Sequence, residues 1–241
     1  MIMIQARMRS ERLPGKVLLP VLGRPLLELM IERLRRVTLA DDIMVATTDD
    51  PSCDPIAELA ERLGVGVHRG SEVDVLGRVI DAARAAHAEL IVETTGDCPL
   101  IDPATIDRVI ASFLAADVDY CSNVLVRTYP RGMDVQVFPL TVLEEVNRLT
   151  TDPPDREHVS LYIYEHPERF RLLNVASGLD PDAAALRLTV DTPQDLSVVR
   201  VVFERLYHRQ PDFDLADVLD LFRAEPELRE LNATIRQKPV R

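Results

Sequence analysis

Short apolar runs alternate along the first half of the chain with longer stretches in which apolar residues recur at helical spacing. The runs are rich in Val, Ile and Leu, and they predict strands at residues 2–4, 43–47, 65–68, 90–93 and 119–122. Strands that alternate regularly with helices form βαβ units. The pattern therefore predicts an α/β fold of three layers, in which a mostly parallel sheet carries helices on both faces, because right-handed crossovers place them there.

The stretches between these strands carry recognisable helix boundaries. Pro25, Asp54-Pro55 and Asp102-Pro103 each predict a helix start with Pro at the first helical position, where its missing N–H costs no hydrogen bond. Gly64 is expected to end the second of these helices, because glycine readily adopts the left-handed conformation that often follows a helix.

The spacing of apolar residues changes after Ser122. Val135 and Val137 alternate with polar residues, which predicts an inserted strand, and Thr141 could cap a helix after it. The later elements are expected to be a short helix over 155–164, strands over 171–175 and 186–190, a long helix opened by Thr192-Pro193, and a charged helical arm over 208–241. Residues 1–241 are expected to form a single domain, with residues 128–164 as an inserted segment.

Composition favours a folded protein of a reducing compartment. Hydrophobic residues make up 46% of the 241 residues, which is ample for a buried core. Cys53, Cys98 and Cys121 are odd in number and far apart, which fits neither a disulfide framework nor paired metal ligands. The apolar start is too short for a signal-peptide core, and nowhere do about 18 apolar residues run together. We therefore expect a cytoplasmic protein with no membrane partner.

The formal net charge of −12 makes one basic segment conspicuous. Such a charge repels nucleic acid over most of the surface, so we expect no nucleic-acid partner. Residues 7–16 nevertheless carry four cationic side chains opposed only by Glu11, and these are Arg7, Arg9, Arg12 and Lys16. Together with the Pro14-Gly15 turn they predict a local phosphate site, with a solvated basic loop as the alternative. No Walker or GxGxxG motif supports a P-loop or dinucleotide-binding function.

Two carboxylates follow predicted strands. Asp97 comes after the strand at 90–93, and Asp191 comes after the strand at 186–190. Ligands of open parallel sheets bind at the carboxyl ends of the strands, and paired carboxylates there can hold Mg²⁺ that also binds substrate phosphates. The alternative is that Asp97 caps a turn. Asp102 and Asp195 are better explained as supports of helix starts.

Several segments, in order from residue 2 to about residue 200, carry a family resemblance. They are Gln5-Ala-Arg through Lys16-Val-Leu, Val45-Ala-Thr-Thr, His68-Arg-Gly-Ser-Glu-Val-Asp-Val-Leu, Gly96-Asp-Cys-Pro-Leu-Ile-Asp, Tyr129-Pro-Arg-Gly-Met-Asp-Val and Val190-Asp-Thr-Pro-Gln-Asp-Leu. The set resembles the SpsF-like cytidylyltransferases of spore coat polysaccharide synthesis, which are relatives of the enzymes that make CMP-Kdo and CMP-sialic acid. One departure is Arg9, where many members carry Gly.

The resemblance implies a Rossmann-like fold of the nucleotide-diphospho-sugar transferase type and a Mg²⁺-dependent transfer of CMP from CTP to a sugar-like acceptor, with release of pyrophosphate. It implies four catalytic residues, of which Arg7 and Lys16 bind the triphosphate and Asp97 and Asp191 are the metal ligands. The implied nucleotide-binding residues are Gln5, Ala6, Arg7, Arg12, Lys16, Arg69, Asp74 and Leu76. The implied acceptor-binding residues are Tyr129, Arg131, Asp134, Arg156 and His158, and a homodimer contact is expected around 128–149, within the inserted segment 128–164.

Two other functions stay open. A glycosyltransferase of similar architecture would consume a nucleotide sugar, although no convincing Asp-x-Asp motif follows a central strand. A non-catalytic nucleotide-binding subunit would keep the fold and bind CTP without turnover. None of the histidines has metalloenzyme spacing, and His158 either contacts the acceptor or merely packs on its helix.

Overall fold

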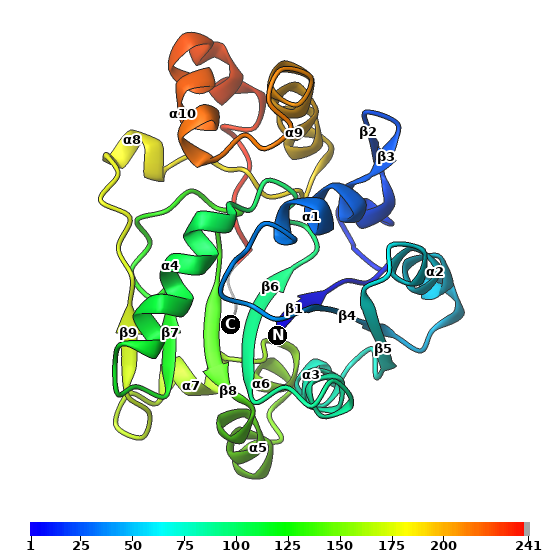
Figure 1. The fold of residues 1–241 in the computed structure, drawn as a ribbon, viewed down its shortest axis with the longest axis vertical. Coiled ribbons are helices and arrows are strands. Elements are labelled where there is room, and N and C mark those ends of the chain that lie inside the picture. Colours follow the sequence, from blue (N-terminus) through cyan, green and yellow to red (C-terminus); the bar gives the residue numbers. More distant parts are fainter. Residues whose placement is uncertain (239–241) are drawn as a thin grey trace.

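A computed structural model of the protein describes residues 1–238. The strands of its main sheet are β1 (Ile2–Gln5), β4 (Ile43–Thr48), β5 (Gly66–Gly70), β6 (Leu90–Thr95), β7 (Tyr120–Ser122), β8 (Gln136–Pro139) and β9 (Leu172–Asn174). Across the described residues they have the order β5-β4-β1-β6-β8-β7-β9 (Figure 1). Pairing is parallel except that β8 lies antiparallel between β6 and β7. A short hairpin of β2 (Pro20–Val21) and β3 (Arg24–Pro25) lies apart from this sheet.

Helices connect and cover these strands. In chain order they are α1 (Leu26–Leu34), α2 (Asp54–Arg62), α3 (Val75–Ala85), α4 (Pro103–Leu114), α5 (Leu140–Leu149), α6 (Pro153–Glu157), α7 (Leu161–Glu165), α8 (Pro181–Ala184), α9 (Pro193–Leu206) and α10 (Leu215–Ala224), with 3₁₀ turns η1 (Lys16–Leu18), η2 (Pro51–Cys53) and η3 (Pro226–Leu231). The expected mostly parallel sheet between helices is confirmed.

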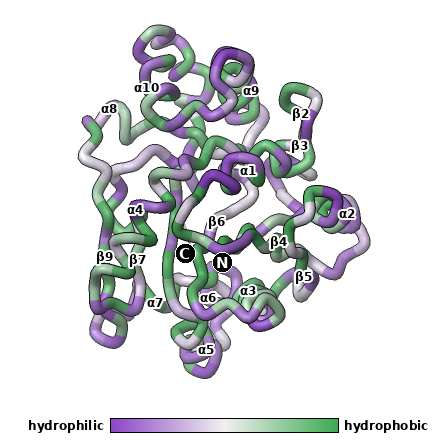
Figure 2. The backbone as a smooth tube through the Cα atoms, in the orientation of Figure 1, coloured by the Kyte–Doolittle hydropathy of each residue, from purple (hydrophilic) through white to green (hydrophobic). Residues whose placement is uncertain are grey.

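The two faces of the sheet are buried against different helices, because successive side chains of a strand point to opposite faces. Ile2 and Ile4 pack with the apolar stripes of α1, α2 and α4, whereas Met3 packs with those of α3 and α5. Figure 2 shows the central strands as largely hydrophobic and the outer helices as mixed. Both faces of β1 are thus removed from water, which is typical of parallel sheets.

A third hydrophobic core joins the C-terminal helices α9 and α10 to α1. Phe203 of α9 and Phe213 pack edge to face with ring centroids 5.6 Å apart. The buried guanidinium of Arg33 lies 4.2 Å from the centre of the Phe213 ring, and its Nε and Nη1 donate to the carbonyls of Ile101 and Phe213 at 2.9 and 3.0 Å. From α10 the chain returns toward the middle of the molecule (Figure 1). Of the predicted arm 208–241, residues 239–241 lie outside the described residues.

The strand predictions are confirmed apart from one. Residues 186–190 do not form a strand, and an isolated bridge between Arg131 and Arg187 is found there instead. The backbone N–H of Leu188 donates to the carbonyl of Arg131 at 2.7 Å, but that of Val190 donates to the carbonyl of Asp97 at 2.8 Å. Because neighbouring amides bond to two different segments, no regular ladder forms.

Two helix boundaries follow their predicted capping residues. Asp102 accepts the N–H of Thr105 at 2.8 Å, and Thr192 forms a capping box with Asp195. Gly64 has φ of 67° and ends α2, with the N–H of Val65 donating to the carbonyl of Ala60 at 3.1 Å. This is the Schellman arrangement that glycine favours.

Four predicted boundaries are wrong. Helix α1 begins one residue after Pro25, and α2 begins at Asp54 itself, so Asp54 is not a cap. Thr141 lies inside α5, which Pro139 precedes. Residues 155–164 contain parts of two helices, because His158 leaves the helical conformation with φ of −108° and ψ of 63°. Short helices are set by such local backbone turns, which apolar spacing does not report.

The carboxyl group of Glu93 is buried within the sheet. Its residue is 2% exposed, and its two oxygens accept from the side-chain amides of Gln5 and of Gln136, the latter at 3.2 Å. Burial raises the pKa of Glu93 to about 8, although the bond from Gln5 opposes the rise. The folded protein therefore holds this carboxyl mostly protonated at neutral pH.

This raised pKa predicts a loss of stability as pH rises. Between about pH 5 and about pH 8 the unfolded carboxyl is ionised while the folded one keeps its proton, so rising pH favours unfolding by about 4 kcal/mol over the window. Glu93→Gln, which carries no titratable group there, should lack this component. Urea unfolding of both proteins across the window measures it, and identical pH dependence in the two would refute the assignment.

Candidate active site

The segments after β1 and β6 meet at the carboxyl ends of the two strands. The N–H of Gly96 donates to the carbonyl of Gln5 at 2.8 Å. A Cβ at Gly96 would lie 3.2 Å from both the Cβ of Ala6 and the carbonyl oxygen of Gln5. Since contacts this short are disfavoured, the sequence Gly96-Asp97 lets the two segments approach closely and aims Asp97 toward the basic segment.

Lys16, Asp97 and Asp191 come together from three distant parts of the chain. The Nζ of Lys16 lies 2.7 Å from Oδ2 of Asp97 and 2.8 Å from Oδ1 of Asp191. Arg12 adds a contact of 3.0 Å to the same Oδ1. Burial acts to lower the pKa of Lys16, but the charges of the two carboxylates outweigh it and raise that pKa. The pKa of Asp191 is lowered, because the charges of Lys16 and Arg12 outweigh the opposite effect of burial.

Asp191 is held from behind by a buried ion-pair network. Arg187 contacts Oδ2 of Asp191 at 2.7 Å through Nη2 and Oδ1 of Asp195 at 2.8 Å through Nε. Asn232 donates to the same oxygen of Asp195 at 2.9 Å. Sequence reasoning missed Arg187 and Asn232. A charged residue within an otherwise apolar buried run was the available signal for Arg187.

A small cleft of about 130 Å³ opens beside the two carboxylates. Besides Asp97 and Asp191 it is lined by Arg131, Asp134 and, from the C-terminal segment, Gln237. Gly132 lies at this wall with φ of 100°, and a Cβ there would come within 2.7 Å of the backbone at Leu188 and Thr189. The cleft wall therefore depends on a glycine at this position.

Two predicted acceptor residues line this cleft, and three do not. Arg131 and Asp134 face it, and Asp134 is also paired with Arg127 at 2.7 Å. Tyr129 is 3% exposed within the core of the C-terminal helices. Arg156 and His158 lie at the end of α6, where the His158 residue is exposed.

Apart from Arg12 and Lys16, the predicted nucleotide residues lie outside the cluster around Asp97 and Asp191. Arg7 contacts Glu72 at 3.6 Å and Glu157 at 3.3 Å, so it does not share the carboxylates of Lys16. Asp74 caps α3 by accepting the N–H of Gly77 at 2.9 Å, and it pairs with Arg156 at 2.5 Å. This ion pair links Asp74, a predicted nucleotide residue, to Arg156, a predicted acceptor residue.

The remaining nucleotide candidates are engaged by the protein itself. Arg69 contacts Asp54 at 2.7 Å and the carbonyl of Thr48 at 3.1 Å. Leu76 of α3 and Ala6, which follows β1, are both buried, so their side chains offer a ligand little surface. The amide of Gln5 donates to Glu93.

The donor set at the cleft fits a divalent cation with few protein ligands. Within residues 1–238 no three His, Cys, Asp or Glu side chains gather as a metal site. Oxygens of Asp97 and Asp191 nevertheless converge on one position, which the Lys16 ammonium takes up. Mg²⁺ commonly uses one or two carboxylates and leaves its other positions to water and substrate phosphates, so this pair suits it.

Cys98 also lines the cleft without a nucleophilic role. Burial and the nearby charge of Asp97 raise the pKa of its thiol well above the ordinary value, which keeps the thiol protonated.

No helix among the described residues has the length and apolar character needed to cross a membrane.

The sequence model of one family, described as cytidylyltransferase, matches residues 1–222. The chain belongs to the cytidylyltransferase family. It is 31% identical to the spore coat polysaccharide biosynthesis protein SpsF of Bacillus subtilis over 93% of this chain and 94% of that protein. The structure of a cytidylyltransferase from Leptospira borgpetersenii serovar Hardjo-bovis matches with a TM-score of 0.90 and 34% identity, covering 98% of both chains.

A similarity over a shorter part of the chain is also found. The 3-deoxy-manno-octulosonate cytidylyltransferase of Geobacter metallireducens is 36% identical over 46% of this chain and 43% of that enzyme. The resemblance to SpsF-like cytidylyltransferases and to CMP-Kdo synthetases is therefore confirmed, and the chain is an enzyme of the cytidylyltransferase type. This assignment agrees with neither the glycosyltransferase nor the non-catalytic alternative.

Proposed function

We propose that this cytidylyltransferase transfers CMP from CTP to a hydroxyl group of a sugar or sugar acid, with release of pyrophosphate. The observation that carries the proposal is the cluster of Lys16, Asp97 and Asp191, which forms where the segments after the neighbouring strands β1 and β6 meet the segment that carries Asp191. Similarity to SpsF and to a 3-deoxy-manno-octulosonate cytidylyltransferase supports a role in precursor synthesis for surface polysaccharides or glycoconjugates.

The chain's own side chains supply positioning and charge for this transfer. The acceptor oxygen attacks the α-phosphorus of CTP, the bond to the bridging oxygen of pyrophosphate breaks, and the hydroxyl proton is released. Lys16 and Arg12 neutralise phosphate oxygens beside the reacting centre, and Arg7 contributes from the end of β1. Asp97 and Asp191 would hold Mg²⁺, whose chemistry there is to offset negative charge on phosphate oxygens.

The cleft beside the carboxylates supplies the acceptor side. Arg131 and Asp134 would orient the acceptor hydroxyl there through hydrogen bonds. Arg156 and His158 stay predictions for a further acceptor contact, as Arg69 and Asp74 do for the nucleotide. A homodimer contact around residues 128–149, the single domain 1–241 and a cytoplasmic location also stay predictions.

Pyrophosphate release tests the reaction directly. Purified protein is incubated with Mg²⁺, each of the four nucleoside triphosphates, and a panel of acceptors that includes Kdo, sialic acids and related sugars. We expect release with CTP and with a narrow set of acceptors. Selective release with another triphosphate would contradict the cytidylyl assignment, and formation of a nucleoside diphosphate from a nucleotide sugar would favour the glycosyltransferase.

Replacing either carboxylate should impair turnover and leave the fold intact. Asp97→Asn and Asp191→Asn should each lower kcat by about 100-fold or more, because groups aimed at charge that develops in the transition state contribute effects of that size. Asp220→Asn is the matched control, since Asp220 lies on α10 in a surface pair with Arg223. Thermal unfolding checks the fold of all three. Near-normal kcat in either cleft variant would remove that residue from the catalytic assignment.

A further inference from the structure

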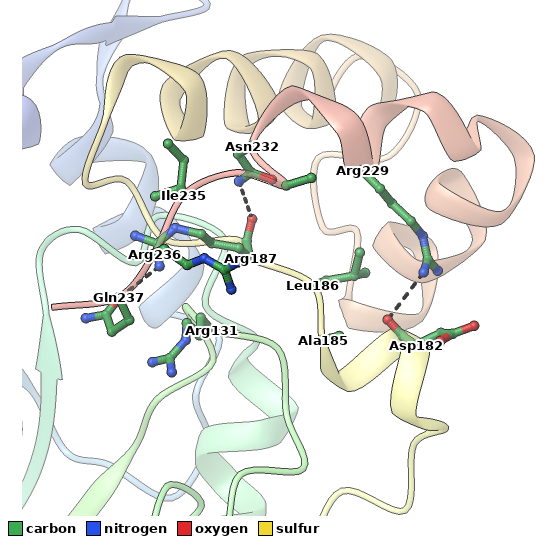
Figure 3. A pocket seen from close by; sticks show the side chains of 11 residues that line it. Arg131, Asp182, Ala185, Leu186, Arg187, Arg229, Asn232, Ile235, Arg236 and Gln237 are labelled. Carbon is green, nitrogen blue, oxygen red and sulfur yellow. Dashed lines mark hydrogen bonds between the residues drawn. The ribbon is translucent and has the colours of Figure 1, made fainter. Parts of the chain in front are cut away.

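A second and larger cavity adjoins the catalytic cleft. Its volume is about 400 Å³, and it shares Arg131 and Gln237 with the cleft that Asp97 and Asp191 line. Figure 3 shows Arg131, Arg187 and Arg236 gathered at one end and Arg229 beside Asp182 at the other. The cavity therefore lies directly beside the cleft that holds the two carboxylates.

Four guanidinium groups line the cavity against one carboxylate. Arg187 is neutralised by Asp191 and Asp195. Within residues 1–238, no ion pair with a carboxylate is formed by Arg131, Arg229 or Arg236, and Arg229 reaches only the backbone carbonyl of Asp182 at 3.4 Å. In a protein of net charge −12 this is a local surplus of positive charge.

The chemistry of Arg131 agrees with such a surplus. Its pKa is lowered, first by burial and then by repulsion from Arg127, and the carboxylates of Asp134 and Asp191 offset only part of this effect. A guanidinium held partly buried beside like charge is stabilised when an anion arrives, because the anion restores the lost solvation and offsets the repulsion. The cavity is thus better suited to an anion than to a neutral sugar.

The C-terminal segment forms one wall of this cavity and is anchored to the catalytic network. Asn232 is buried and donates to the backbone carbonyl of Arg187 at 3.0 Å as well as to Asp195. Gln237 accepts from Nη1 of Arg187 at 2.8 Å. The match to the family model ends at residue 222, so Arg229, Arg236 and Gln237 lie beyond the part that the family model describes.

We propose that this cavity binds an oxyanion group, a phosphate or a carboxylate, carried by the acceptor at a distance from the hydroxyl that receives CMP. The proposal rests on the proposed transfer, which places that hydroxyl beside Asp97 and Asp191. Arginine side chains bind phosphate and carboxylate through paired N–H groups, and a cavity of about 400 Å³ is of a size usual for small-molecule ligands. Arg229 and Arg236 then select acceptors by this distal charged group.

Anion binding is tested without turnover. Inorganic phosphate is titrated into the full chain at constant ionic strength by calorimetry. The double variant Arg229→Gln with Arg236→Gln should weaken the binding by about tenfold or more, since hydrogen bonds to charged groups contribute on that scale. The double control Arg205→Gln with Arg223→Gln loses the same two charges from exposed surface pairs outside the cavity lining, and should bind as the unaltered protein does. Equal affinity in the double variant and the control overturns the site.

Turnover distinguishes an anion on the acceptor from a free anion. The acceptor that supports pyrophosphate release is compared with a form of it that lacks the distal phosphate or carboxylate. We expect the double variant to raise KM for the charged acceptor by about tenfold, to change kcat little, and to leave the uncharged form unaffected. An equal effect on both forms overturns the acceptor assignment and indicates a free anion.

The two arms also separate this inference from the proposed function. If no acceptor supports release of pyrophosphate, the proposed function fails and the acceptor assignment fails with it. The phosphate titration still decides whether the cavity binds anions, because it needs neither CTP nor turnover.

Discussion

The ammonium group of Lys16, held between the carboxylates of Asp97 and Asp191, is the contact on which the rest of the site depends. Two carboxylates that are mostly buried repel one another and favour protonation unless a cation stands between them. Lys16 meets that requirement, Arg12 adds to it, and Arg187 balances the far side of Asp191. The negative charge of the two carboxylates is therefore balanced by cationic side chains of the protein itself.

The fold brings these groups together through its parallel strands. Strands β1 and β6 are neighbours, so the basic segment after the first and Asp97 after the second start from the same edge of the sheet. Asp191 arrives from elsewhere, on a segment bonded to the carbonyls of Arg131 and Asp97 rather than within a strand. This arrangement ties the segment that carries Asp191 to the cleft wall, so that the wall and Asp191 are positioned together.

Much of this could be predicted from the sequence. Apolar runs located the strands around residues 2–5 and 90–95 because burial on both faces of a parallel sheet demands such runs. Asp102 and Thr192 predicted the starts of α4 and α9, because their side chains accept hydrogen bonds from the first backbone N–H groups of the helix. Segment 186–190 looked like a strand because it is equally apolar and buried, but its hydrogen bonds are divided between two partners. Apolar pattern reports burial and not the identity of the hydrogen-bond partner.

The site residues that lie in family motifs could be predicted from the sequence. The residues that contact them from distant parts of the chain could not. Lys16, Asp97 and Asp191 do converge, whereas Arg7 lies with other partners. Asn232 reaches the network from the C-terminal segment through a buried amide, and no local pattern signals such a contact.

The most direct measurement of the central claim is a crystal structure of the complex with CTP and Mg²⁺. We expect the triphosphate to contact Lys16 and Arg12 with both carboxylates beside the phosphates. CTP bound elsewhere, with the contacts among Lys16, Asp97 and Asp191 intact, would contradict the account.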